Sequence, residues 1–213
     1  LRASLEQKQK DLAEQIFAKE DLLDRTRSSE RTFQTLLENL RTQYQIIESE
    51  ISSIEQQVRQ RLEAQDRLPG GGDSNSFSWP TPSRYITARF HDPDYPYRHV
   101  FEHNGIDIRA AQGTQIRAAA SGYVARAKRC SDARCYSYVM LIHGNGLATV
   151  YGHLSRVAVD EDQFVTRGDV IGYSGGTPGT VGAGPFVTGP HLHFEVRKNG
   201  IPVNPINHLV VDL

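Results

Sequence analysis

The stretch "GPHLHFEV", residues 189–196, has the alternation of a β-strand with two unlike faces. Successive side chains of a strand point to opposite sides, so polar and apolar residues separate here. The apolar side consists of Leu192, Phe194 and Val196, and the polar side consists of His191, His193 and Glu195. The apolar side predicts a strand packed on a core. The polar side carries three groups that bind protons or metal ions, so the same strand predicts a functional site.

The surroundings of this strand indicate a β domain. Short β-rich runs follow one another, separated by glycine-containing turns and without an amphipathic helix among them. The runs are "RYITARF", "TQIRAAA", "SGYVARAKR", "SYVMLIH", "LATVYGH" and "DVIGYSG". Such a pattern is typical of antiparallel sheets. We therefore predict a mainly β domain over residues 84–213, built as two packed antiparallel sheets or as a split barrel.

Residues 1–67 contain no glycine or proline and are rich in helix-forming residues. Steps of four and three residues along this segment meet apolar side chains in one register. These are Leu5, Leu12, Ile16, Leu23, Phe33, Leu37, Leu40, Tyr44, Ile47, Ile51, Ile54 and Val58. A seam with this heptad spacing predicts a long α-helical coiled coil.

The apolar seam needs a partner, because a lone helix would expose it to water. The partner is the helix's own second half, another copy of the chain or a different protein. The polar stretch "TRSSE", residues 26–30, allows the helix to fold back as a hairpin. A spacer, a dimer rod and a regulatory arm all fit this pattern.

Residues 68–83, "LPGGGDSNSFSWPTPS", have the composition of a flexible Gly/Ser/Pro linker between the two parts. Across the 213 residues, 24 Lys and Arg nearly balance 25 Asp and Glu, so we expect no nucleic acid partner. The sequence has no apolar run of membrane-spanning length. Because it begins in mid-pattern at Leu1, we interpret it as a mature or trimmed piece whose export signal or anchor would precede it.

The two cysteines, Cys130 and Cys135, lie in "RCSDARCYS" with four residues between them. This spacing can close a small loop between two strands, and a disulfide there would suit an oxidising compartment. Two free thiols are the alternative.

Two further histidine clusters accompany the opening strand. In "EHNGIDI", His103 and Asp107 are four residues apart, so on a strand both face one side. Imidazole nitrogen and carboxylate oxygen are donors that Zn²⁺ accepts. A neighbouring strand that carries His193 would complete three protein ligands, the number typical of catalytic zinc. Together these residues predict a zinc site.

The third cluster, "VYGHLS", places His153 at the end of a strand. A site that hydrolyses an amide needs a base for the attacking water and a donor for the developing oxyanion. His153 and His191 are the candidates for these two roles. His91, His99 and His208 are interpreted as surface or core residues, and His143 in "IHGNG" as part of a hairpin.

These motifs resemble those of the lysostaphin-type, or LytM-like, zinc metallopeptidases, which cut peptide cross-links of bacterial peptidoglycan. The matching pieces, in the family's order, are "HNGIDI", "HGNGLATVYGHLS", "RGDVIGYSGGTPG" and "GPHLHFEVRKNGIPVNP". By this resemblance, His103, Asp107 and His193 are the zinc ligands. His153 and His191 are the pair that activates water and steadies the tetrahedral intermediate.

The resemblance also implies a tyrosine that points at the oxyanion, for which Tyr97 is the best candidate and Tyr95 the alternative. It gives Glu195 a supporting role behind a metal-bound histidine. The glycine-rich stretch "SGGTPGTVGAGPFVTGP", residues 174–190, would form a wall of the substrate groove or a mobile surface loop.

The resemblance implies a zinc-dependent endopeptidase that acts on peptidoglycan peptide stems in the cell envelope, either periplasmic or extracellular. Some members of the family have a coiled coil followed by a domain without the zinc residues, and act as binding modules that activate cell-wall amidases during division. This chain keeps every position of the metal and catalytic set, which favours the hydrolase. A lipoyl or biotinyl carrier domain is a third reading, but Lys128 and Lys198 lie outside suitable motifs.

Overall fold

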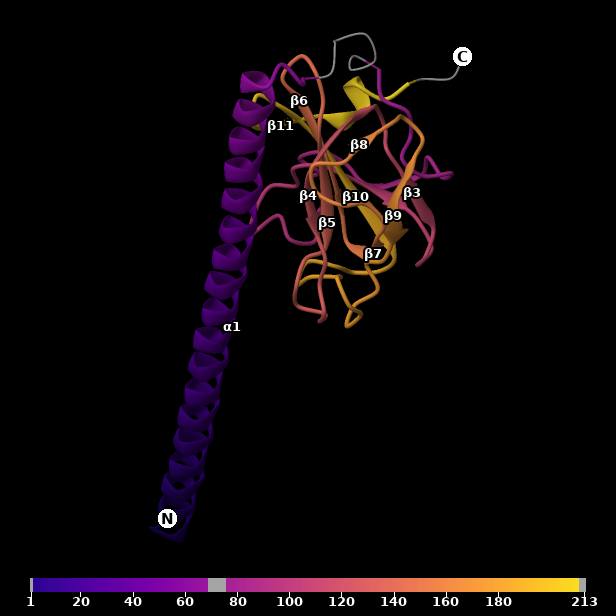
Figure 1. Ribbon diagram of the computed structural model, residues 1–213. Coiled ribbons are helices and arrows are strands. Elements are labelled where there is room, and N and C mark those ends of the chain that lie inside the picture. The colour runs from indigo at the N-terminus through magenta and orange to yellow at the C-terminus, as the bar shows by residue number, and fades with distance from the viewer. Residues whose placement is uncertain (1, 69–75, 211–213) are drawn as a thin grey trace. The chain divides into compact units, whose positions relative to one another are not determined.

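The computed structural model describes residues 2–68 and 76–210, and its side chains from Gln15 on except that of residue 17. The chain divides into two compact units, Leu1–Gln45 and Ile46–Leu213. Helix α1 runs from Arg2 to Ala64 without interruption (Figure 1). The helical hairpin allowed by the sequence at residues 26–30 is therefore wrong, since intact helical backbone passes through this stretch.

The apolar seam of α1 has two different surroundings. In the first unit, Ile16 and Phe33 are 50% and 57% exposed. The side chains of Leu5 and Leu12 lie outside the described residues. Pairing of this part in a coiled coil stays a prediction.

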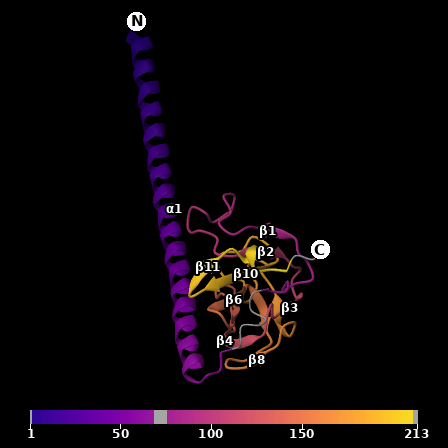
Figure 2. The ribbon, with the colours of Figure 1, turned by 90° about the horizontal axis from the view of Figure 1, so that it is seen from above.

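In the second unit, the seam of α1 is buried against the large β-sheet, and Figures 1 and 2 both show this segment beside the sheet. The helix contributes Ile47, Ile51, Ile54, Val58 and Leu62, and the sheet contributes Ala125, Tyr138, Met140, Ile142, Ala148 and Val150. Ile51 and Leu62 are only 1% and 2% exposed. The division into compact units falls between residues 45 and 46, and the domain boundaries at 67 and 84 stay a prediction. The helical segment 46–64 belongs to the β domain, because its apolar face forms part of that domain's core.

The large sheet is antiparallel, with strand order β1-β2-β10-β6-β5-β4-β8 and with β11 paired to β10. Its strands are β1 (Ile86–Ala88), β2 (Ile106–Arg109), β4 (Gly122–Lys128), β5 (Tyr138–Ile142), β6 (Leu147–Gly152), β8 (Phe164–Val165), β10 (His191–Lys198) and β11 (Ile201–Val203). The small sheet has the order β3-β9-β7. Its strands are β3 (Gln115–Arg117), β7 (Leu154–Val157) and β9 (Val170–Ser174), and a short 3₁₀ helix, η1 (Pro205–Asn207), follows β11. The predicted mainly β fold is confirmed.

Both faces of the large sheet are covered. Strand β5 shows this most clearly, because all five of its residues are buried. Val139 and Leu141 belong to the core that also includes Ile116 and Ile171 of the small sheet. Tyr138, Met140 and Ile142 pack with α1. The helical segment therefore provides the second cover that the continuous apolar run requires.

The last part of the predicted linker belongs to the fold. Phe77 is fully buried in the main core and pairs with Leu209. Trp79 packs against the same core, and its indole donates to the carbonyl of Val210. Residues 69–75 of the predicted linker lie outside the described residues.

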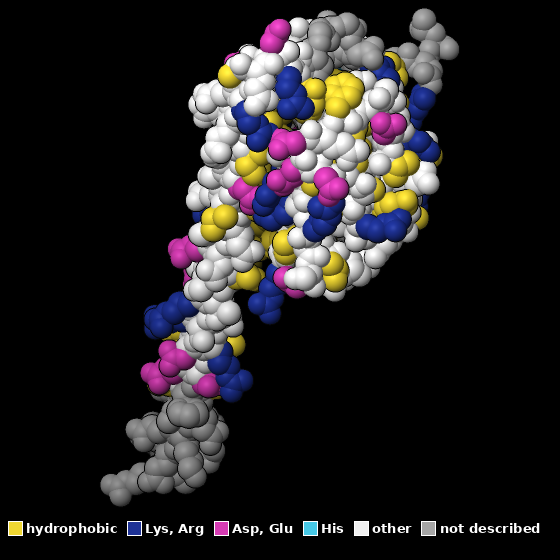
Figure 3. All heavy atoms as spheres, viewed as in Figure 1, with side chains coloured by type: hydrophobic (Ala, Val, Ile, Leu, Met, Phe, Trp, Pro, Cys, Tyr) yellow, Lys and Arg dark blue, Asp and Glu magenta, His cyan; other side chains and the backbone are white. Residues whose placement is uncertain are grey.

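Cys130 and Cys135 form a disulfide that closes the loop between β4 and β5, as their spacing predicted. Within the described residues, none of the helices is long and apolar enough to cross a membrane. Figure 3 shows basic and acidic side chains interspersed on the displayed face of the β domain, in line with the net charge of -1.

Candidate metal and catalytic site

Three neighbouring strands bring the candidate residues together. Asp107 of β2 and His193 of β10 are direct partners in the antiparallel register. On its other side His193 pairs with Gly152 of β6, and His153 follows directly. Sheet register therefore places residues from three distant parts of the sequence at one point.

His103 does not lie on a strand, which corrects the sequence prediction, because β2 begins only at Ile106. Its imidazole still reaches the site from the preceding loop. His103 Nε2 lies 3.2 Å from Asp107 Oδ1 and 3.1 Å from His193 Nδ1. The loop approaches closely at Gly105, where a Cβ would lie 2.5 Å from the carbonyl oxygen of Phe194.

The remaining ring nitrogens fix the tautomers of the two histidines. His103 Nδ1 donates to the carbonyl oxygen of Arg89 at 2.7 Å, and His193 Nε2 donates to Glu195 Oε1 at 3.1 Å. Their other nitrogens then carry lone pairs. These lone pairs face each other and the Asp107 carboxylate, whose Oδ1 lies 3.0 Å from His193 Nδ1. Three acceptors at such distances repel one another unless a cation lies between them.

The donor set fits a zinc ion. The ligand atoms of His103, Asp107 and His193 all lie within 4.8 Å of one another. Tetrahedral Zn²⁺ with bonds of about 2.0–2.1 Å separates its ligand atoms by roughly 3.3 Å. The observed separations of 3.0 to 3.2 Å are close to this value. Both imidazoles also have the outer hydrogen-bond partner that metal-bound histidines usually possess.

Without a metal, a proton occupies this cluster. Burial favours the neutral forms of Asp107 and His193, but the hydrogen bonds between them outweigh burial. The pKa of Asp107 is held well below its usual value by His103 and His193. Asp107 and Glu195 raise the pKa of His193 to about 10. The cluster therefore favours a positive charge at this point, which is either a metal ion or the proton on His193.

His153 lies beside the cluster in a strained backbone conformation, with φ of 56°. Its Nδ1 donates to the carbonyl oxygen of Ala183 at 2.6 Å, so Nε2 carries the lone pair. Burial lowers its pKa well below the usual value, and neighbouring His191 and His193 lower it further. His153 is therefore a neutral imidazole with a free acceptor.

His191 is oriented in the same way. Its Nδ1 donates to the carbonyl oxygen of Gly189 at 2.7 Å, and its Nε2 lies 3.6 Å from Asp107 Oδ1. The ring centroids of His191 and His153 are 4.8 Å apart. The imidazoles of His153 and His191 thus lie next to the three-residue cluster, and their catalytic roles stay predictions.

Tyr97 and Tyr95 have different positions. The Tyr97 hydroxyl donates to the carbonyl oxygen of Val187 at 3.3 Å. The Tyr95 ring stacks on His103, with centroids 4.2 Å apart. Both tyrosines line a cavity of about 100 Å³ beside Asp107 and His191. Both tyrosines therefore reach the cavity, and the role of Tyr97 at the oxyanion stays a prediction.

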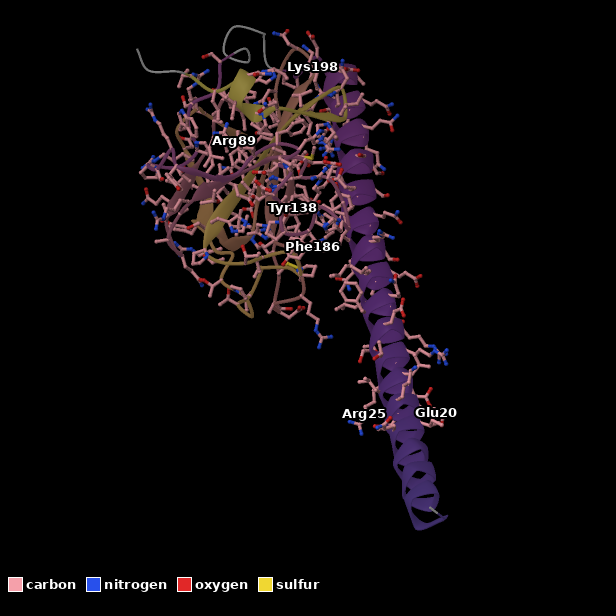
Figure 4. The ribbon with its side chains drawn as sticks, turned by 180° about the vertical axis from the view of Figure 1, so that it is seen from behind. Glu20, Arg25, Arg89, Tyr138, Phe186 and Lys198 are labelled. Carbon is pink, nitrogen blue, oxygen red and sulfur yellow. A yellow bond between two sulfur atoms is a disulfide. The ribbon has the colours of Figure 1, made fainter. Side chains whose placement is uncertain are left out.

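One loop orients all three non-ligand candidates. Between β9 and β10, the carbonyl groups of Ala183, Val187 and Gly189 accept from His153, Tyr97 and His191. From the same loop, Phe186 and Thr188 line the cavity, and Phe186 is labelled in Figure 4. Part of the glycine-rich stretch therefore lines the cavity, and its role as a wall of the substrate groove stays a prediction.

The other histidines stay outside this site. The ring of His91 stacks on Phe90, and that of His208 lies 6.0 Å from Phe77. His99 is not part of the candidate metal cluster found among the described residues. His143 is buried, donates from Nδ1 to the carbonyl oxygen of Ser121 and lies 2.8 Å from the Thr149 hydroxyl, which is a structural role at the end of β5.

Arg197 was missed by the sequence analysis. Its side chain is 1% exposed, and its Nη1 lies 2.8 Å from Glu195 Oε2. The alternation that places His191, His193 and Glu195 on one face continues to Arg197, and this was the available signal.

Comparison with known proteins assigns the β domain. Residues 101–205 match the model of peptidase family M23. The DD-carboxypeptidase/endopeptidase Mpg of Neisseria meningitidis is 41% identical over 123 residues, which are 57% of this chain and 26% of that protein. Stage II sporulation protein Q of Bacillus subtilis is 36% identical over 107 residues, which are 49% of this chain and 35% of that protein. The chain thus spans about a quarter to a third of the length of these relatives.

Solved structures agree with this assignment. A zinc-containing peptidase from Vibrio cholerae superimposes with a TM-score of 0.53 and 29% identity, covering 66% of this chain and 41% of that one. Lysostaphin from Staphylococcus simulans superimposes with a TM-score of 0.50 and 25% identity, covering 62% and 52%. Residues 101–205 of the β domain are therefore similar to peptidase family M23, the lysostaphin-type family that the motifs resemble.

Proposed function

We propose that this chain is a zinc-dependent endopeptidase that hydrolyses peptide cross-links of bacterial peptidoglycan. The observation that carries the proposal is the convergence of three lone-pair donors, His103 Nε2, Asp107 Oδ1 and His193 Nδ1, at 3.0 to 3.2 Å. The relative Mpg, named as a carboxypeptidase and endopeptidase, and the zinc-containing peptidase of Vibrio cholerae support it.

In this proposal, His103, Asp107 and His193 would hold Zn²⁺, which would polarise the scissile carbonyl and lower the pKa of water. His153 accepts a proton from the attacking water at its free Nε2, because its Nδ1 is committed to Ala183. His191 contributes its own Nε2 from the start of β10, and Tyr97 lines the adjacent cavity. His191 can steady the developing oxyanion when its Nε2 carries a proton, and Tyr97 can do so when its hydroxyl turns from Val187 to the substrate.

The cavity limits the size of the substrate side chain that can bind beside the proposed metal site. Its volume of about 100 Å³ is well below the roughly 300–1,000 Å³ of sites for drug-sized ligands. It accommodates a small side chain, and the rest of a peptide would lie outside it. We place the protein in the cell envelope, periplasmic or extracellular, because the proposed substrate is there and because the disulfide suits an oxidising compartment.

Metal analysis and peptidoglycan digestion test the proposal. The wild-type chain should contain one zinc per chain and release cross-linked peptides from peptidoglycan. His193→Ala should lose both, whereas His99→Ala, which alters an exposed histidine outside the cluster, should retain both. Absence of zinc and of released peptides from the wild-type protein would contradict the proposal.

A binding module that activates a cell-wall amidase is the second candidate. It is favoured by the relative named Stage II sporulation protein Q, whose name specifies no peptidase, and by the long helix with exposed apolar residues. Under this alternative, the wild-type chain would release no peptides by itself but would stimulate an added amidase. The full set of metal and catalytic positions favours the hydrolase.

A further inference from the structure

Arg197 is a charged side chain buried in the β domain on the same face as His193 and Glu195. It lies on β10, four residues after His193. Of its side-chain surface, 1% is exposed. A buried guanidinium requires partners for its five N–H donors, because an unpaired charge in the interior is costly.

The partners of Arg197 come from β10 itself and from α1. On the strand side, Nη1 donates to Glu195 Oε2 at 2.8 Å and Nη2 donates to the carbonyl oxygen of Gly200 at 3.0 Å. From α1, Ser52 Oγ lies 3.1 Å from Nη2. Glu48 Oε2 lies 3.4 Å from Nη1, and Glu55 Oε2 lies 3.3 Å from Nε. The guanidinium therefore connects successive turns of α1 to β10, the strand that carries His193.

Glu195 continues this connection to the metal cluster. Its two carboxylate oxygens have separate tasks, since Oε1 accepts from His193 Nε2 and Oε2 accepts from Arg197. Arg197 thereby fixes the rotation of the Glu195 carboxylate. That rotation in turn fixes the plane of the His193 ring, whose Nδ1 faces Asp107 and His103. A continuous series of contacts runs from α1 to a proposed metal ligand.

Stability alone does not explain this arrangement. Three carboxylates, those of Glu48, Glu55 and Glu195, surround Arg197, and Glu55 also pairs with Arg59. Removing such groups from water costs free energy that their attraction often only balances. Apolar residues already hold the helix on the sheet. The charged cluster instead fixes the orientation of side chains on the strand that carries His193.

We propose that Arg197, held by Glu48, Ser52 and Glu55 of α1, is a positioning residue that fixes Glu195 and through it the metal ligand His193. The helical segment 46–64 thereby contributes to the geometry of the proposed metal site. This inference rests on the proposed function, because it assigns residues that act on the proposed zinc site.

The chain offers a matched control on the same helix. Glu50 also binds the sheet from α1, with Oε2 2.6 Å from Lys128 Nζ and Oε1 3.0 Å from the hydroxyl of Tyr138 (labelled in Figure 4). These contacts, together with an ion pair to Arg126, attach Glu50 to β4 and β5 and not to Arg197 or Glu195. Loss of Glu50 should therefore weaken the attachment of the helix to the sheet but leave the orientation of His193 unchanged.

The experiment compares the full chain with Glu48→Ala/Glu55→Ala and with Glu50→Ala. Zinc affinity is measured by competition with a chelator, and ligand geometry is measured by the visible absorption of the Co²⁺-loaded protein. The double variant should bind zinc about tenfold more weakly, as expected when an outer partner of a metal ligand is disturbed. It should also shift the Co²⁺ absorption. Glu50→Ala should leave both unchanged.

Two further variants provide independent tests of the same inference. Ser52→Ala removes one neutral contact and should give a smaller shift in the same direction, so the inference remains testable if the double variant does not fold. Arg197→Lys keeps the charge but not the planar fork, and should resemble the double variant. Equal effects of Glu50→Ala and the double variant on zinc affinity would mean that only helix attachment matters, and would overturn the inference.

A metal-free measurement separates this inference from the proposed function. The ¹⁵N shifts of the His193 ring report its bond to Glu195 whether or not zinc binds. They should change in the double variant and stay constant in Glu50→Ala. Zinc missing from the wild-type protein overturns the proposed function, whereas unchanged ¹⁵N shifts in the double variant overturn the inference.

Discussion

His193 and Asp107 face each other across β10 and β2, with His193 Nδ1 3.0 Å from Asp107 Oδ1. Two residues earlier on the same strand, His191 directs Nδ1 to a backbone carbonyl instead of to the cluster. The two histidines of one strand face therefore have different contacts. Replacing each histidine by alanine should therefore affect zinc content and turnover differently.

His193→Ala removes a proposed metal ligand and should lose zinc and activity together. His191→Ala should keep zinc and lose turnover by about 10²–10⁴-fold, the usual contribution of a general acid or base. Zinc content by atomic spectroscopy and peptide release by chromatography check both statements. A His191→Ala protein without zinc would show that His191 is needed for the metal itself.

The loop between β9 and β10 provides a second prediction. Gly182 has φ of 78°, and a Cβ there would lie 2.3 Å from the carbonyl oxygen of Leu154. Gly182→Ala should shift the neighbouring Ala183 carbonyl, which anchors His153. We expect turnover to fall by about tenfold or more, by loss of alignment, with zinc retained.

Gly179→Ala is the matched control for this variant. Gly179 has φ of 79°, so alanine meets a similar backbone cost, but its Cβ would have no atom within 4 Å. Steady-state kinetics with a synthetic peptide measures both variants. If Gly179→Ala reduced turnover as much as Gly182→Ala, backbone strain in the loop and not the anchor of His153 would be responsible.

The helical segment 46–64 should contribute to the stability of the β domain. Ile51 is 1% exposed and packs with residues of the large sheet. Ile51→Ala should lower the free energy of unfolding by about 2–5 kcal/mol, the range for a buried isoleucine or leucine. Leu22, which is 66% exposed, should change it by less than about 0.5 kcal/mol when replaced by alanine. The single tryptophan, Trp79, packs against the main core and reports urea unfolding by its fluorescence.

His143 should make stability depend on pH. Burial lowers its pKa from 6.5 to about 4 in the folded protein, so the unfolded chain binds a proton first as pH falls. The stabilising effect is therefore complete above about pH 6.5 and is lost between pH 6.5 and 4. It amounts to about 3 kcal/mol in total, at about 1.4 kcal/mol per pH unit.

Urea titrations between pH 7 and 4 measure this dependence. His143→Gln should flatten the slope of the unfolding free energy against pH in that interval. His99→Gln, which replaces an exposed histidine, should leave the slope as in the wild-type protein. An unchanged slope in His143→Gln would contradict the assignment to His143.

Much of the fold and the ligand set follows from local patterns in the sequence. The period of two in "GPHLHFEV" predicts both the strand and the division of its faces. The spacing of Cys130 and Cys135 predicts a closed loop. His103 was expected on a strand because its spacing to Asp107 is even, but the loop around Gly105 brings it to the same place. Spacing alone cannot distinguish these two routes.

The partner of the helix could not be predicted, because a heptad seam fits a sheet as well as another helix. The relevant signal lay in the sheet. "YVMLI", residues 138–142, is apolar throughout, which indicates a strand covered on both faces. The contacts of Arg197 with Glu48 and Glu55 join residues more than 140 positions apart, and no local pattern contains such pairs.

Glu48 and Glu55 are seven residues apart, so they share one side of α1 and reach the same guanidinium. This makes the helix sensitive to residue count as well as to composition. Deleting a single residue between the two would rotate one of them by about 100° relative to the other. Homologous chains that retain the contact with Arg197 should therefore tolerate substitutions in this interval far better than changes in its length.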